Sequence, residues 1–76
     1  MKTLYHIQWW SRGKWTNTYF GNKVDEDTQL YYFDTLEEAR EALDQQYQQQ
    51  RNAGRKKLTK YSILQMMNDK IIHQYP

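Results

Sequence analysis

The chain has 76 residues, a length that fits one small domain with one hydrophobic core. It has no cysteine, which excludes a disulfide framework, and its two histidines have no second ligand at metal-ligand spacing, which argues against a structural zinc site. The formal net charge is +2, and no apolar run reaches the length of a membrane-spanning helix. We therefore expect a single domain over residues 1–76, soluble and cytoplasmic, that uses no cofactor and no metal.

Charged residues are segregated along the chain. Residues 25–44 contain eight acids and one base, Arg40, which gives this segment a net charge of −7. Residues 51–60 contain five bases and no acid, which gives a net charge of +5. The two segments therefore offer surfaces of opposite sign, which the near-neutral total conceals.

The first part of the chain is typical of antiparallel strands. Residues 3–10 alternate with a period of two and are rich in β-formers, which predicts a strand. Residues 11–14 then predict a turn, and residues 15–20 predict the return strand of a hairpin. Residues 21–28 are polar and predict an exposed loop, and residues 29–33 predict a third short strand.

A helix start is the clearest local signal in the chain. Either Asp34 or Thr35 can serve as the N-cap, because a glutamate follows each of them three positions later. Apolar residues then recur at helical spacing, and Gly54 suits a left-handed helix stop. A helix is therefore predicted over residues 36–53. Its apolar face consists of Leu36, Ala39, Ala42, Leu43 and Tyr47.

Two predictions are open for the C-terminal segment. Residues 61–67 and 70–75 fit two strands around a tight turn, because Asn68 and Asp69 tolerate positive φ. The alternative is a closing helix, since Gln, Met and Leu are good helix formers. With the hairpin, the fold is α+β, in the order hairpin, third strand, helix and C-terminal hairpin. The one helix then packs on one face of an antiparallel sheet.

Residue types that carry catalysis are scarce. No cysteine nucleophile, glycine-rich phosphate loop or histidine pair is present. We interpret His6 and His73 as packing or solvent-facing side chains. Residues 25–27 are interpreted as a solvated loop, because the spaced oxygens and glycine of a calcium loop are missing. The expected function is therefore binding and not catalysis.

Basic and aromatic residues favour a nucleic-acid-binding site. Lysine and arginine neutralise backbone phosphates, and a neighbouring aromatic ring can stack on a base. The bases after the predicted helix also complement its dipole, and that simpler role stays open. The candidate contacts to DNA or RNA are Arg12, Lys14, Trp15, Arg51, Arg55, Lys56, Lys57 and Lys60.

The tryptophans and the bases of the first hairpin can extend the predicted nucleic-acid-binding site. Trp9 and Trp10 are adjacent on the predicted strand and must point to opposite faces, so one sheet face exposes a tryptophan. Arg12, Lys14 and Lys23 lie at the ends of the first hairpin and can extend the basic patch over the sheet.

A host protein is the alternative partner. Glu37, Glu41 and Asp44 recur every three or four residues on one outer face of the predicted helix. Such a row of carboxylates can dock on a basic protein surface, and it is equally compatible with an ordinary solvated face. Trp10 completes the candidate residues for this contact. A small chain that exposes aromatic side chains is also a candidate homodimer.

Two parts of the sequence resemble known DNA-binding domains. The Arg-Gly-Lys-Trp of residues 12–15, and the Tyr-Phe-Asp-Thr-Leu-Glu-Glu-Ala of residues 32–39 with the Ala-Leu-Asp of residues 42–44, resemble AP2-type domains and the arm-binding domains of phage integrases. The resemblance covers about residues 5–50. It implies that a three-stranded sheet on one helix enters the DNA major groove and that Arg12, Lys14 and Trp15 contact DNA.

The layout is equally similar to that of another group of proteins. Phages and mobile elements encode small proteins with a hairpin, a helix and a second hairpin. Some of these inhibit host machinery by direct protein contact, as anti-CRISPR-like inhibitors do. This similarity implies a host protein as the partner.

Overall fold

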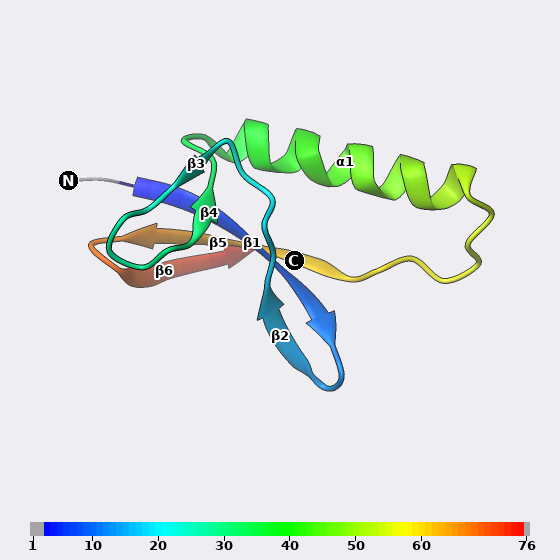
Figure 1. The fold of residues 1–76 in the computed structure, drawn as a ribbon, viewed down its shortest axis with the longest axis horizontal. Coiled ribbons are helices and arrows are strands. Elements are labelled where there is room, and N and C mark those ends of the chain that lie inside the picture. The colour runs from blue at the N-terminus through cyan, green and yellow to red at the C-terminus, as the bar shows by residue number, and fades with distance from the viewer. Residues whose placement is uncertain (1–2, 76) are drawn as a thin grey trace.

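The computed structural model describes residues 3–75, which form one helix and strands arranged as an α+β fold (Figure 1). Within this range no helix is long and apolar enough to cross a membrane. In chain order the elements are β1 (Thr3–Ser11), β2 (Lys14–Asn17), β3 (Lys23–Val24), β4 (Tyr31–Tyr32), α1 (Leu36–Asn52), β5 (Tyr61–Met67) and β6 (Lys70–Tyr75).

The main sheet is antiparallel throughout and has the order β2-β1-β5-β6. Strands β1 and β5 are far apart in sequence, yet they pair from Thr3 opposite Met67 to Trp9 opposite Tyr61. Because side chains alternate between the faces of a strand, Ile7 and its partner Ile63 project to the same side.

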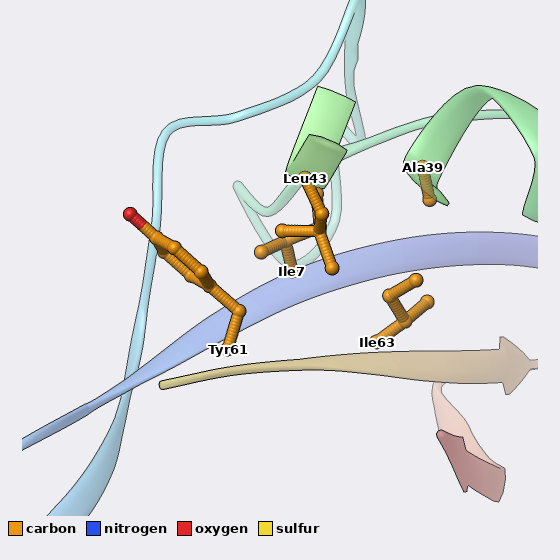
Figure 2. Packing of buried hydrophobic residues seen from close by; sticks show 5 residues of the cluster. All are labelled: Ile7, Ala39, Leu43, Tyr61 and Ile63. Atoms are coloured by element: carbon orange, nitrogen blue, oxygen red, sulfur yellow. The ribbon is translucent and has the colours of Figure 1, made fainter. Parts of the chain in front are cut away.

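The helix covers that side of the sheet. Ile7, Ile63 and Tyr61 pack against Ala39 and Leu43 of α1, and all five are buried (Figure 2). The predicted apolar helix face is confirmed, since Leu36, Ala42 and Tyr47 are partly buried against the same cluster.

The opposite face is covered over part of its area by the segment that contains β3 and β4. Tyr32 of β4 is buried with Leu4, Leu64 and Met66, whose side chains alternate away from the helix. His6, on the same face, is fully buried, and its Nδ1 lies 2.6 Å from the Tyr31 carbonyl oxygen. His6 is therefore a packed and hydrogen-bonded core residue.

Gly21 lies just before β3 and allows the chain there to pass close to the backbone of β4. A Cβ atom at Gly21 would lie 2.4 Å from the backbone nitrogen of Tyr32, which is far inside any normal contact distance. Only glycine therefore fits here without a backbone shift.

The helix begins as the sequence predicts. Thr35 is the N-cap, and its hydroxyl accepts a hydrogen bond from the Glu38 backbone N–H at 3.2 Å and donates one to the Glu38 carboxylate at 3.0 Å. The Thr35 hydroxyl thus satisfies one backbone donor of the first turn, and the Glu38 carboxylate reaches back to that hydroxyl. The helix ends at Asn52, one residue before the prediction, and Gly54 has the expected left-handed backbone with φ of 77°.

Of the two C-terminal predictions, the hairpin is correct and the closing helix is wrong. Asn68 and Asp69 both have positive φ, as the two-residue turn between β5 and β6 requires. Arg12 and Gly13 make the same kind of turn between β1 and β2.

Two of the sequence predictions for residues 15–33 are wrong in detail. The return strand ends at Asn17, because Thr18 turns inward and its hydroxyl donates to the Ile7 carbonyl at 2.7 Å. Residues 21–28 include the short strand β3, and β4 pairs with β3 instead of extending the main sheet as a full strand. Phe33, directly after β4, pairs with Tyr5 of the main sheet as an isolated bridge.

Truncation of Ile63 tests the position of the core. Ile63 is 2% exposed between β1 and α1, so Ile63→Ala should lower the free energy of unfolding by about 2–5 kcal/mol. The control is Ile71→Ala on β6, where the side chain is 59% exposed and the loss should be well under 1 kcal/mol. Urea unfolding measures both variants, and equal losses would contradict the described core.

Candidate nucleic-acid interface

Three tryptophans gather where β1 turns into β2. Trp9 is 38% and Trp10 is 45% exposed, so each side of the strand exposes a tryptophan. Trp10 lies opposite Trp15 of β2, and their rings meet edge to face with 5.3 Å between centroids. This pair stiffens the end of the hairpin while leaving aromatic surface open to solvent.

The connector, residues 55–60, runs from the end of α1 to the start of β5 and lies against the tryptophan end of β1. Trp10 donates its backbone N–H to the Lys60 carbonyl at 2.8 Å, which continues the β1–β5 pairing beyond Tyr61. This backbone hydrogen bond holds the connector beside the exposed tryptophans.

Gln50 of α1 anchors the connector from the other side. Its side-chain amide N–H donates to the Tyr61 hydroxyl at 3.2 Å, and its Oε1 accepts from the Thr59 backbone N–H at 2.7 Å. The Gln50 carbonyl also accepts from the Arg55 N–H at 3.1 Å. Gln50 is buried, so these bonds satisfy its polar atoms and fix both ends of the connector.

Tryptophans and bases share one shallow groove between the connector and β1. Its volume is about 330 Å³. It is lined by Trp9, Trp10, Arg55, Lys57, Leu58, Thr59 and Lys60. We call this the Trp–Lys groove.

A second depression of about 430 Å³ adjoins the Trp–Lys groove at Lys60. Half of its lining residues are aromatic, namely Trp15, Tyr47 and Tyr61, and Lys60 is its one charged lining residue. The two depressions together form a path of aromatic surface with cations along one part of it.

The predicted nucleic-acid contacts fall into three groups. Arg55, Lys57 and Lys60 line the Trp–Lys groove, and Trp15 lines the adjoining depression. Arg51 and Lys56 are exposed in the same region without lining either one. The remaining two contacts, Arg12 and Lys14, are exposed at the β1–β2 turn, next to the Trp10–Trp15 pair.

Lys23 does not extend this surface. Its Nζ donates to the Asp34 carboxylate, and this hydrogen bond and the negative charge of Asp34 raise the pKa of Lys23. It belongs to β3, which Figure 1 shows beside the start of α1, whereas the connector lies beyond the end of α1.

The interpretation of residues 25–27 as a solvated loop is wrong for Asp25, which is 8% exposed. Its carboxylate accepts from the Thr28 backbone N–H at 3.0 Å and from the Thr28 hydroxyl at 2.7 Å. Asp25 therefore closes the turn between β3 and β4, while Glu26 and Asp27 are exposed. Over residues 3–75 no group of three or more acids or histidines could hold a metal ion.

The acidic helix face points into solvent. Glu37, Glu41 and Asp44 are exposed, and helical geometry places them away from the buried Ala39 and Leu43. Trp10, which the sequence groups with them as a protein contact, lies instead in the Trp–Lys groove. His73, on β6, is exposed, and its ring packs edge to face on Tyr75.

Three features of this region were not predicted from the sequence. Trp9, Leu58 and Thr59 line the groove, and Gln50 anchors the connector. Gln50 follows Leu43 by seven residues and Tyr47 by three, and this spacing alone places it on the buried helix face.

Comparison of the chain with protein-family models, curated proteins and solved structures gives no match. The geometry and charge of the described residues therefore carry the functional argument.

Replacement of Gln50 tests how the connector is held. Gln50→Leu removes the acceptor for the Thr59 N–H, so amide hydrogen exchange across residues 55–60 should accelerate at least several-fold. The matched control is Gln49→Leu, because Gln49 is an exposed neighbour on the same helix. Equal exchange rates in the two variants would show that Gln50 does not anchor the connector.

Proposed function

We propose that this protein is a small non-enzymatic module that binds nucleic acid through the Trp–Lys groove. The single observation that carries the proposal is that Trp9 and Trp10 line the same groove as three cations, Arg55, Lys57 and Lys60. Cations attract phosphates and an exposed ring can stack on a base, so this groove combines both features that such binding requires.

The placement of charge supports the proposal. The acids of residues 25–44 lie on the β3–β4 segment and the first part of α1, and the connector lies past the last turn (Figure 1). A helix of 17 residues spans about 25 Å, which exceeds the Debye length at physiological salt. Phosphates at the groove are therefore largely screened from the acids at the start of the helix.

Charge removal within the groove tests this function. Lys57→Ala should weaken binding to a short oligonucleotide and lower the slope of log K against log salt by about 0.7–0.9, the value for one lost phosphate contact. The triple variant Arg55→Ala, Lys56→Ala and Lys57→Ala should lower the slope by about 2.

Lys70→Ala provides the control for Lys57→Ala. It removes the same charge at an exposed site beside Met67, which pairs with Thr3 at the opposite end of β1 from the tryptophans. Its affinity and salt slope should match those of the unmodified protein. Binding by the triple variant at full strength would refute the role of the connector.

A second candidate function is inhibition or adaptation of a host protein through the acidic face of α1. The observation that favours it is the exposure of Glu37, Glu41 and Asp44 as one row on a helix face that does not pack on the sheet. A basic protein surface is the complementary partner.

Charge reversal tests the second candidate. Glu37→Lys with Glu41→Lys should abolish capture of a basic partner protein while leaving the thermal unfolding midpoint within a few degrees, because both side chains are exposed. Gln45→Lys with Gln48→Lys is the control, because it introduces two lysines at other exposed positions of α1. Undiminished capture by the Glu variant would exclude this face.

A further inference from the structure

The β3–β4 segment covers part of the sheet face opposite α1. On the face opposite α1, the β3–β4 segment covers Leu4, Leu64 and Met66 with the buried Tyr32. What stays open on that face lies around the Trp10–Trp15 pair, toward the β1–β2 turn, and along the edge strand β6, where Ile71 is exposed. A broad sheet face that could enter the major groove of a duplex is therefore not available over the N-terminal half of β1.

The aromatic rings are arranged for bases that are free of pairing. Trp9 and Trp10 leave opposite sides of β1, yet both line the Trp–Lys groove, so aromatic surface borders the connector from two directions. Bases inside a duplex are already stacked on their neighbours, whereas each unpaired base offers an open π-face.

The cations that line the groove lie along a single short segment. Arg55, Lys57 and Lys60 belong to one connector of six residues, which can follow one phosphate backbone but does not reach across to a second. Two strands of a duplex would require cations on two separated lines. Outside the groove, the exposed bases Arg12 and Lys14 lie at the β1–β2 turn beside the Trp10–Trp15 pair, and the opposite end of the molecule carries Glu26 and Asp27 together with Lys70.

From these observations we propose that the Trp–Lys groove binds single-stranded nucleic acid in preference to duplex, with bases stacked on Trp9 and Trp10 and phosphates on Arg55, Lys57 and Lys60. This inference rests on the proposed nucleic-acid-binding function. Recognition through stacking tolerates any base sequence, because every base has a π-face.

The experiment compares fluorescently labelled strands of about 12 nucleotides, within the site sizes of small single-strand-binding domains, with their duplexes. Single-stranded DNA, single-stranded RNA and duplex DNA of the same sequence are titrated with the full chain, and anisotropy is recorded at low salt. The single strands should bind at least tenfold more tightly than the duplex. A preference between the two single strands would identify the sugar that the groove accepts.

Two pairs of variants locate the bases. Trp9→Leu and Trp10→Leu remove a ring but keep an apolar side chain, and each should weaken single-strand binding by roughly 5- to 100-fold. Trp9→Phe and Trp10→Phe keep a ring and should bind within a few-fold of the unmodified protein. Residual duplex binding should be the same in all four, and circular dichroism confirms that each variant is folded.

The outcomes separate this inference from the function on which it rests. Duplex binding as tight as single-strand binding, or Leu variants as tight as Phe variants, would overturn the single-strand inference and leave nucleic-acid binding intact. No saturable binding to any of the three probes would overturn both.

Discussion

The pairing of β1 with β5 is the constraint on which the rest of the structure depends. It joins residues 52 to 64 positions apart, from Trp9 opposite Tyr61 to Thr3 opposite Met67. Ile7 and Ile63 meet at its centre and are almost fully buried, and burial of each such side chain is worth roughly 1.5–3 kcal/mol. With β1 and β5 fixed side by side, β2 and β6 become the edges and α1 has one apolar surface to cover.

The same pairing creates the candidate site. Because its register continues to Lys60, whose carbonyl accepts from the Trp10 N–H, the basic connector cannot swing away from the tryptophan end of β1. Gln50 fixes the connector to the last turns of α1 by bonds to Thr59 and Tyr61. The cations are therefore preorganised beside the aromatic rings, which lowers the conformational entropy lost when a ligand binds.

Local signals in the sequence predicted the local elements, and non-local contacts decided what they missed. The N-cap at Thr35, the two-residue turn at Asn68 and Asp69 and the apolar helix face could all be predicted, because each depends on residues close together in the sequence. The placement of Trp9 and Trp10 against the connector was not, because it depends on which strand lies beside β1, and hydrophobic alternation does not specify strand order. The sequence composition predicted the exposed bases of the connector, but it did not predict the groove that they line.

The most direct test of the account is a two-dimensional ¹H–¹⁵N NMR titration of the labelled protein with a short single-stranded oligonucleotide. If the Trp–Lys groove binds the strand, the indole N–H signals of Trp9 and Trp10 and the backbone amides of residues 55–60 shift together and saturate, while amides of the β5–β6 turn stay in place. Shifts confined to the acidic face of α1 or to β6, or no shifts at all, would contradict the assignment of the Trp–Lys groove as the binding site.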